Sequence, residues 1–340
     1  MEEQIEKKPL YLSASKIKTA TTCSWQYYAS YVLGIPQSGN SGASRGTIVH
    51  NLFELISKPK HQHFIKKIWT AGSPEKIPQI KRFLERQFKN EKIIQSEDVK
   101  PIKVKWGKLN NWETVCQMIM TTMKLEFIDK SLEHIIDSEY EFNIVNESPR
   151  YAIRGFIDRV EKNEAGELRI LDYKSSAKKF KGEEQDSNIQ AMIYSLVARK
   201  TWKNFKKYKA SFLFMRFIDD PYQDSEFSEP ELQGLESYLE YLTNYLEDFN
   251  MEKAKSNLAN SDLTKSWLCG RGKWVCPYRD RVTFYRIYKK DQPETGKGVA
   301  SYLKIDEAQK HLEDLNKKED LFEIKIMNYA GCPAFHSTAT

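Results

Sequence analysis

The chain has 340 residues, which is long enough to bury a large hydrophobic core, and its 40% apolar share argues against wholesale disorder. Its net charge of +6, from 53 basic and 47 acidic residues, is compatible with nucleic acid but does not by itself indicate a broad basic surface. No stretch is apolar and long enough to span a membrane, and residues 1–8 lack the pattern of a secretory signal peptide. The five cysteines are odd in number and scattered, which disfavours a disulfide framework. We therefore expect a globular protein of the cytoplasm.

The N-terminal half is predicted to be mainly helical. Residues 1–58 contain a helix over 13–35, a Gly/Ser/Asn loop over 37–44 and an amphipathic helix over 47–56. Residues 59–135 are polar, rich in lysine and helical in pattern, and we interpret them as a helical insertion.

Strands and helices alternate in the remainder of the chain. Residues 136–220 contain strands between 139 and 173, a helix over 187–202 and a buried strand over 210–217. Residues 221–340 contain a helix over 231–251, strands over 282–288 and 299–305, a charged helix over 306–318 and a last strand over 322–327. This order predicts an α/β fold with a central mixed sheet flanked by helices, most simply as one integrated domain.

Two neighbouring strands carry the most informative residues. The link over 163–166 has the composition of a hairpin turn, so the strands around Asp158 and Asp172 are expected to pair. Side chains alternate along a strand, so Asp172 and Lys174 project from one face, and pairing can bring Asp158 close to them. Two carboxylates and a lysine can hold a divalent metal and a cationic group around a phosphate. A solvated edge strand is the alternative, but apolar residues surround both acids, and charge is costly there.

Three further features accompany this strand pair. His50 lies on the helix over 47–56, and an imidazole nitrogen is a good ligand for divalent metals, although a satisfied core histidine is an alternative. Glu139 and Glu141 precede the first strand motif, and either could join the acidic cluster. Gln190 and Tyr194 are four residues apart on a helix, so they share one face and could contact a phosphate or orient a catalytic group.

In order, these pieces resemble the PD-(D/E)XK nuclease superfamily, and specifically its RecB-like exonuclease branch, which includes AddB-type and CRISPR-adaptation nucleases. The matching pieces are an opening helix, a histidine motif, an acidic motif, an acid-x-Lys motif and a Gln-x-x-x-Tyr motif, at residues 12–28, 46–50, 155–159, 172–174 and 190–194. Ile157 stands where the proline of the superfamily's name would be. The resemblance implies a restriction-endonuclease-like core with a helical insertion and a cysteine-containing C-terminal extension.

The resemblance also implies residue roles. The metal ligands for Mg²⁺ or Mn²⁺ would be His50, Asp158, Asp172 and the main-chain carbonyl of Tyr173. Lys174 would orient the attacking water and stabilise the transition state. The remaining catalytic groups, Gln190 and Tyr194, would hold the DNA strand and support the site.

The implied function is a metal-dependent DNA exonuclease of a bacterial or phage-infected cell, acting in recombination, repair or phage DNA metabolism. The expected partners are DNA ends or single strands and a separate helicase or recombination protein, because no G-x-x-x-x-G-K sequence for a fused motor occurs in the chain. The alternatives are a catalytically inactive nucleic-acid-binding subunit and a restriction-type endonuclease. The intact acid-x-Lys motif and histidine disfavour the first, and the Gln-x-x-x-Tyr pair disfavours the second.

The cysteines raise the question of a second cofactor. Some members of the RecB-like branch hold a 4Fe–4S cluster with one cysteine from the opening helix and three from the C-terminal tail. Cys23, Cys269, Cys276 and Cys332 are the corresponding candidates, although Cys332 lies far from the expected compact triplet. A zinc site or unligated thiols are alternatives, and Cys116 is expected to be a core thiol.

Overall fold

The computed structural model describes residues 9–99, 108–128, 134–261, 266–270, 275–290, 297–317 and 319–336. The chain forms two compact units, one of Met1–Tyr11 and Gly39–Glu240, the other of Leu12–Ser38 and Tyr241–Thr340. Strand β1 (Tyr11–Leu12) and helix α9 (Glu229–Glu247) lie across the boundaries between them. Within the described ranges, no helix combines the length and the apolar character needed to cross a membrane.

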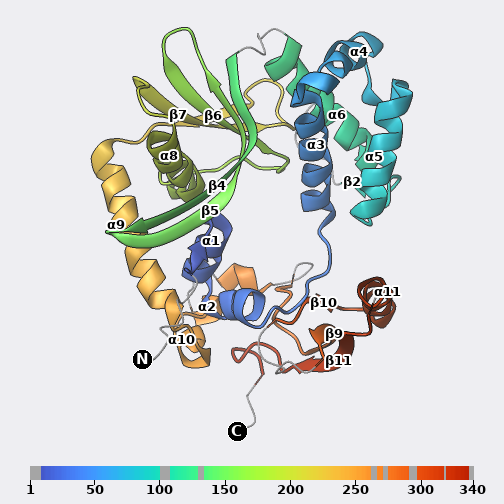
Figure 1. Cartoon of the computed structure of the whole chain (residues 1–340), viewed down its shortest axis with the longest axis vertical. Helices are drawn as coiled ribbons and strands as arrows, with labels where there is room; N and C mark the ends of the chain where they lie inside the picture. The colour runs from blue at the N-terminus through green and yellow to red at the C-terminus, as the bar shows by residue number, and fades with distance from the viewer. Residues whose placement is uncertain are drawn as a thin grey trace. The chain divides into compact units, whose positions relative to one another are not determined.

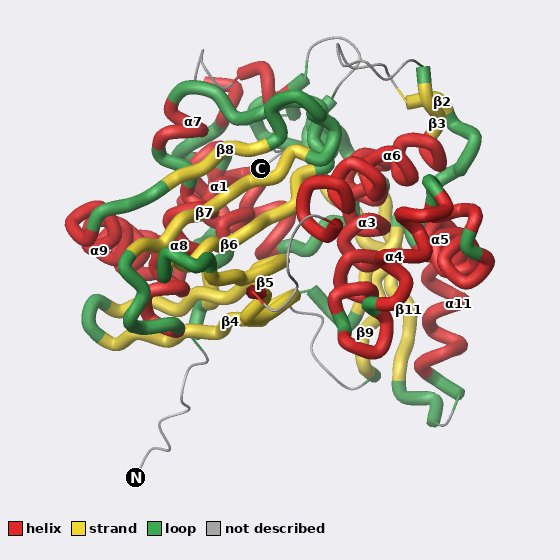
Figure 2. Tube along the Cα trace, turned by 90° about the horizontal axis from the view of Figure 1, so that it is seen from above, coloured by secondary structure: helices red, strands yellow, loops and turns green. Residues whose placement is uncertain are grey.

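A mixed β-sheet forms the centre of the first unit, as predicted. Its main strands are β4 (Ile135–Glu147), β5 (Arg150–Lys162), β6 (Glu167–Lys174), β7 (Lys207–Phe214) and β8 (Tyr222–Ser225). The neighbours in this series pair antiparallel, except that β6 and β7 run parallel, and Figure 2 shows the five strands side by side in this order. The parallel pair requires a crossover, which contains the short helix α7 (Glu183–Asp186) and helix α8 (Ile189–Thr201). Helix α8 packs against β6 and β7 (Figure 1).

The predicted hairpin between β5 and β6 is confirmed. Gly166 adopts φ +75°, a conformation that glycine reaches at little cost, and its amide donates to the Asn163 carbonyl at 3.1 Å. The turn sets a register in which Arg159 lies opposite Leu171 and Lys162 opposite Leu168. This register puts Asp158 and Asp172 on adjacent strands at the same level of the sheet.

Within the first unit, the segment over residues 41–128 is mainly helical. They are α3 (Ser41–Ser57), η2 (Pro59–His61), α4 (His63–Ala71), η3 (Pro74–Lys76), α5 (Pro78–Asn90), α6 (Asn111–Met123) and the π-helix η4 (Lys124–Ile128). A small ladder of β2 (Asp98–Val99) and β3 (Leu109–Asn110) interrupts the predicted helical insertion, whose residues 100–107 and 129–133 lie outside the described ranges. The loop expected through residue 44 is shorter than predicted, because the Asn40 side chain accepts from the Gly42 amide at 2.8 Å and starts α3 at Ser41.

Helix α3 is anchored by the core that it shares with the sheet. Ile48, Leu52 and Phe53 are buried together with Leu171 and Tyr173 of β6. The Phe53 ring lies 5.1 Å from the Tyr173 ring, centroid to centroid. Each such side chain contributes about 1.5–3 kcal/mol through burial. This packing places Gly46 and His50 of α3 next to the end of β6.

The second unit has a separate core and a three-stranded antiparallel sheet. Its elements are α1 (Ala14–Thr22), α2 (Ser24–Tyr27), the π-helix η1 (Tyr28–Val32), α10 (Met251–Lys255), η6 (Ala259–Ser261), η7 (Ser266–Cys269), β9 (Val282–Lys289), β10 (Ala300–Tyr302), α11 (Ile305–Leu315) and β11 (Phe322–Tyr329). The predicted hairpin of β9 and β10 is confirmed, and β11 pairs along the other edge of β9. Helix α11 ends at Leu315, and residue 318, the predicted end, lies outside the described residues.

The prediction of one continuous helix over 13–35 is wrong at Cys23. That residue has an extended backbone, with φ −152° and ψ 109°, and separates α1 from α2. The cause is tertiary: the Ser24 amide donates to the Asn257 carbonyl at 2.9 Å, and the Ser24 hydroxyl donates to main-chain carbonyls near α10. These bonds replace those that a continuous helix would have made.

Candidate active site

Asp158 links the two predicted strand motifs to the histidine helix. Its Oδ2 accepts from the Tyr173 amide at 2.6 Å, and its Oδ1 lies 3.1 Å from Nδ1 of His50. Asp158 and Asp172 are only 9% and 4% exposed. The structure therefore brings together His50, Asp158 and the 172–174 motif, which are far apart in the sequence.

His50 is held between two hydrogen-bond acceptors. Nδ1 faces the Asp158 carboxylate, and Nε2 lies 2.8 Å from the main-chain carbonyl oxygen of Tyr173. Both ring nitrogens therefore carry protons in this arrangement, and the ring is an imidazolium. Burial disfavours that charge, but the carboxylates of Asp158 and Asp172 and the Tyr173 carbonyl together raise the pKa of His50 to about 9.

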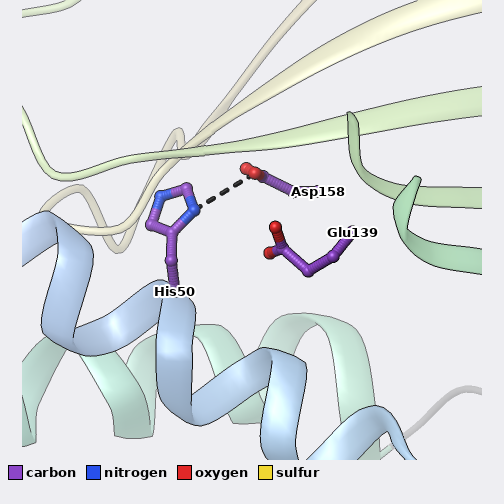
Figure 3. Close-up of side chains that lie close together, drawn as sticks. All are labelled: His50, Glu139 and Asp158. Atoms are coloured by element: carbon purple, nitrogen blue, oxygen red, sulfur yellow. Dashed lines mark hydrogen bonds and ion pairs between the residues drawn. The ribbon is translucent and has the colours of Figure 1, made fainter. Parts of the chain in front are cut away.

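Glu139 completes a group of three potential metal ligands. One ligand atom each from His50, Glu139 and Asp158 lies within 4.8 Å of the other two, and Figure 3 shows the three side chains converging. Glu139 has φ +55°, which is unusual for a residue with a side chain, whereas the next acid along β4, Glu141, is exposed opposite Phe156. Alternation along the strand predicted either glutamate, and the register distinguishes them, because Glu139 lies at the level of Asp158 and Glu141 lies opposite Phe156.

The carboxylates of this site repel one another. Burial, together with the Asp158 carboxylate, raises the pKa of Glu139 to about 7. Burial likewise raises the pKa of Asp172, although Lys174 opposes the shift. A bound cation would relieve this crowding, so the residues present fit a divalent metal. Carboxylate oxygens with one imidazole nitrogen and open positions suit Mg²⁺ or Mn²⁺.

The acid-x-Lys motif forms its own cluster with helix α8. Lys174 Nζ lies 2.7 Å from Oδ2 of Asp172 and donates to Oε1 of Gln190 at 2.8 Å. The Gln190 amide donates to Oδ1 of Asp172 at 2.9 Å and to the Tyr194 hydroxyl at 2.6 Å. The Tyr194 hydroxyl is in turn 3.0 Å from Oδ1 of Asp172. Gln190 and Tyr194 therefore hydrogen-bond the acid-x-Lys motif, and their role in supporting the site stays a prediction.

The side chain of Asn188 positions that helix. It accepts from the amides of Gln190 and Ala191 at 3.1 and 3.2 Å and so caps the N-terminus of α8. The cap defines where the first turn begins, and Gln190 lies in that turn.

Roles for Asp172 and the Tyr173 carbonyl as metal ligands remain predictions, because Asp172 bonds to Lys174, Gln190 and Tyr194 and the carbonyl bonds to His50.

The four candidate cluster cysteines all belong to the second unit. Cys332 is buried in the same apolar core as Trp25 and Tyr278, and Cys23 and Cys276 pack against it. The Cys276 amide donates to the Cys269 carbonyl at 3.3 Å. Burial raises the pKa of Cys332 to about 11, and the other three thiols add to the shift. Four soft thiol donors in one region fit an iron–sulfur cluster in chemistry, although no three of these described sulfur atoms gather within 4.8 Å.

The fifth cysteine differs from these four. Cys116 lies on α6 in the first unit, and burial, with nearby Glu75 and Glu113, raises its pKa to about 12. A thiol in that environment stays protonated. Cys116 is only partly buried and is not part of the core that α6 forms with α3, so its placement as a core thiol stays a prediction.

A mixed sheet with two central acids, a neighbouring lysine and a helix-borne histidine defines the class of protein. The family model of the PD-(D/E)XK nuclease superfamily matches residues 11–281, which is more than half of the chain. The chain therefore belongs to the PD-(D/E)XK nuclease superfamily, as the sequence motifs predicted.

Curated relatives and a solved structure are similar to parts of the chain. An ATP-dependent helicase/deoxyribonuclease subunit of Lactococcus lactis subsp. cremoris strain SK11 is 25% identical over 239 residues, which are 67% of this chain and 20% of that protein. The exonuclease/helicase subunit RexB of strain MG1363 is 24% identical over 238 residues, with the same two coverages. A solved structure of an Eubacterium rectale protein aligns with a TM-score of 0.43 at 11% identity and covers 78% of this chain and 90% of that one. The chain thus spans about a fifth of the length of the curated relatives that it matches.

Proposed function

We propose that this chain is a metal-dependent deoxyribonuclease that hydrolyses phosphodiester bonds, and that it degrades DNA from its ends. The observation that carries this proposal is the convergence of His50, Glu139 and Asp158 beside the Asp172–Lys174 ion pair. Glu139 and Asp158 place two carboxylates beside one imidazole, and a divalent cation there would allow Glu139 to ionise, while Lys174 supplies a positive group paired with Asp172. A purely structural site would have no reason to concentrate negative charge in this way.

The residues of the chain divide the chemical work. When bound, Mg²⁺ or Mn²⁺ supplies a Lewis acid that lowers the pKa of a bound water and offsets charge on phosphate oxygens. His50, Glu139 and Asp158 would hold the ion, with Asp172 and the Tyr173 carbonyl as the additional predicted ligands. His50 must lose one proton to do so, since both of its nitrogens are donors in the metal-free protein.

Lys174 acts on the attacking water and on the phosphate. Two of its three N–H donors are used by Asp172 and Gln190 among the described residues, and the third is directed by those two contacts. We propose that this donor orients the attacking water and then stabilises the charge that develops on the phosphate. Gln190 and Tyr194 hold the ammonium and Asp172 in place, and we extend to them the predicted contact with the DNA strand.

The names of the relatives support a biological setting. They describe subunits that combine helicase and deoxyribonuclease or exonuclease functions in proteins about five times longer than the matched region. We propose that this chain works with a separate helicase or recombination protein, in recombination, repair or phage DNA metabolism.

The test compares end-labelled linear DNA with closed circular DNA in Mg²⁺ or Mn²⁺. We expect the wild type to degrade the linear DNA and Lys174→Ala to be at least about a hundredfold slower. Lys81→Ala, which removes an exposed lysine from α5, is the matched control and should retain full activity. Equal activity of Lys174→Ala and wild type would refute the role of the lysine. Cutting of closed circles would instead indicate a restriction-type endonuclease, and binding without cutting an inactive subunit.

We also propose that Cys23, Cys269, Cys276 and Cys332 ligate a 4Fe–4S cluster. Their common location in the second unit and their mutual effect on thiol pKa support this assignment. Protein purified anaerobically should contain about four iron atoms and absorb in the visible region, and Cys276→Ser should lose both properties. Cys116→Ser is the matched control and should retain them. Zinc in place of iron, or no metal at all, would contradict the cluster.

A further inference from the structure

Two arginines that the sequence analysis did not single out lie next to the candidate active site. Arg45 is in the first turns of α3, and Arg216 follows β7 by two residues. The residues next to both arginines contact the segment just at the C-terminal end of β6. The amide of Met215 donates to the Lys174 carbonyl at 2.9 Å, and a Cβ added at Gly46 would lie 2.7 Å from the Ser175 hydroxyl oxygen. The neighbours of the two arginines therefore contact Lys174 and Ser175, beside the catalytic lysine.

Both guanidinium groups are buried. Arg45 is 9% and Arg216 is 6% exposed. Arg45 donates to Oδ1 of Asn111 at 2.5 Å, and Glu97 is the acidic residue that favours its charge. For Arg216, the buried Nε has no hydrogen-bond acceptor among the described residues, and no ion pair is formed within them.

The two cations also repel each other. Burial, reinforced by the positive charge of Arg45, lowers the pKa of Arg216 to about 10. Burying an arginine without an acidic partner is costly, and placing it near a second arginine increases the cost. The first unit shows the usual solution elsewhere, where Arg159 and Arg169 are paired with Glu126 and Glu161. Arg45 reaches Glu97 only through Asn111, and no acidic side chain among the described residues favours the charge of Arg216, so the pair is suited to an anion supplied from outside.

We propose that Arg45 and Arg216 form a phosphate-binding subsite that holds a phosphate of the bound DNA strand other than the one being cleaved. The proposal rests on the proposed nuclease function for the identity of the ligand. Guanidinium groups bind phosphate oxygens through two parallel N–H donors. Two arginines together can offset the charge of a phosphodiester and donate hydrogen bonds to its oxygens. The ligand is a phosphate group, either an internal phosphodiester or the terminal phosphate of a strand.

The main variant is Arg216→Gln, and the matched control is Arg82→Gln, which removes an exposed arginine from α5. Affinity for a fluorescent single-stranded oligonucleotide is measured in EDTA, so that no cleavage occurs. We expect Arg216→Gln to weaken binding about tenfold or more. The slope of log affinity against log salt should fall by about 0.7, the value for one lost phosphate contact on a single strand. Equal losses in Arg82→Gln and Arg216→Gln would overturn the subsite, since they would reflect net charge alone.

Thermal unfolding separates the subsite from a structural role and from the nuclease activity. Removing a buried, unpartnered charge should leave the melting temperature of Arg216→Gln unchanged or raised in phosphate-free buffer. Inorganic phosphate should raise the melting temperature of the wild type but not that of the variant. Arg216→Lys, which keeps the charge without the planar fork, should recover part of the phosphate effect. A variant that melts below the wild type and still responds to phosphate would overturn the proposal.

Two further comparisons show which phosphate is bound and distinguish a failure of the subsite from a failure of the nuclease function. Oligonucleotides with and without a 5′-phosphate should lose affinity equally in Arg216→Gln if the ligand is internal, and only the phosphorylated one should lose it if the ligand is terminal. A wild type that responds to phosphate and binds DNA but cuts none would refute the nuclease function and leave the subsite standing. A wild type that cuts DNA but shows no phosphate response would refute the subsite alone.

Discussion

The two central strands of the sheet carry charge on both faces, and the two faces differ in how that charge is balanced. Consecutive residues of a strand point to opposite faces, so Asp158 and Arg159 belong to different clusters. On the face of Arg159, two arginines meet two glutamates. On the face of Asp158, three carboxylates meet one histidine and one lysine.

The first of these clusters is a closed network of ion pairs. Arg159 lies 2.7 Å from Glu161, and Arg169 lies 2.8 Å from Glu161 and 3.2 Å from Glu126, nitrogen to oxygen. Glu126 has no exposed surface and also accepts from the Tyr222 hydroxyl. Every charge has an opposite partner, so the cluster can hold η4 against the sheet without any ligand.

The second cluster sets three carboxylates against His50 and Lys174, so without a metal its charges balance only while Glu139 holds a proton, and the Arg45–Arg216 pair has an excess of positive charge. Neither group is balanced among the described residues when all of its members are ionised, and both flank the end of β6. A balanced buried cluster therefore indicates a structural role, while an unbalanced one indicates a ligand of the opposite sign. Both clusters lie on the same two central strands, so the balance of charge is what distinguishes the structural cluster around Arg159 from the candidate active site around Asp158.

The largest effect is expected from Asp158→Asn in the unbalanced cluster. Metal affinity should fall, and the nuclease rate should drop by about 10³-fold, the upper end for one transition-state-stabilising group. Stability should fall less than in a variant of the balanced cluster, because the change removes the His50–Asp158 ion pair but also relieves repulsion with Glu139 and Asp172, and the amide oxygen can still accept from the Tyr173 amide. Calorimetric titration with Mn²⁺, the cleavage assay and thermal unfolding measure the three quantities. Asp137→Asn, on an exposed part of β4, is the control, and an Asp158→Asn variant destabilised as much as Glu126→Gln would contradict this expectation.

The opposite outcome is expected from Glu126→Gln in the balanced cluster. Removing one partner leaves buried arginine charge uncompensated, so the free energy of unfolding should fall by about 3 kcal/mol or more. The folded fraction should retain its specific nuclease activity, because the ion-pair and hydrogen-bond partners of Glu126 include Arg159, Arg169 and Tyr222, which are not proposed metal ligands. Urea unfolding and the cleavage assay test this pair of results, with Glu85→Gln on the surface of α5 as the control. Unchanged stability would show that the network is not structural.

A pH dependence of metal binding is the next largest effect. The pKa of His50 is raised to about 9 and that of Glu139 to about 7, so both hold protons near neutrality in the metal-free protein. A metal needs both groups deprotonated, so its affinity should rise with pH from 6.0 to 8.5, by up to about tenfold per unit for each proton released. Stability of the metal-free protein should change in the opposite direction, because the His50–Asp158 ion pair stabilises it at low pH and is lost as pH rises through about 9. Mg²⁺ titration calorimetry in buffers of different ionisation enthalpy measures both affinity and protons, and a flat profile in the wild type would contradict the assignment.

The smallest effect concerns the helix that serves the unbalanced cluster. Asn188→Ala removes the cap of α8 and should lower the free energy of unfolding by about 1 kcal/mol. Because Gln190 lies in the uncapped turn, the cleavage rate should fall modestly as well. Asn143→Ala, at an exposed position of β4, is the control for both measurements. A loss of stability with no change in rate would show that the cap does not position Gln190.

Much of the site was predictable because its short-range geometry follows from local rules. The turn at 163–166 and the alternation of β6 placed Asp172 and Lys174 on one face beside Asp158. The helical spacing of Gln190 and Tyr194 placed both on one face, and both contact Asp172. These relations depend on neighbours in sequence, which share one element or one hairpin.

The remainder depends on contacts between distant segments. Alternation allowed either Glu139 or Glu141, and the register of β4 against β5, which puts Glu139 at the level of Asp158, decided between them. The break at Cys23 comes from hydrogen bonds to Asn257, more than two hundred residues away. No local pattern marked Arg216, whose only signal is a charge directly after an apolar strand.

Local periodicity predicted the class of fold and the pairing of the strands around Asp158 and Asp172, and the order of the acidic, lysine, histidine and Gln-x-x-x-Tyr motifs carried the resemblance that the family model confirms. The tertiary structure alone decided which charges are balanced. Packing of α3, η4 and the end of β7 against two strands pairs Arg159 and Arg169 with glutamates and leaves Arg45 and Arg216 without an ion pair among the described residues. Electrostatic balance depends on distances between segments far apart in the chain, and the linear order of the residues does not contain those distances.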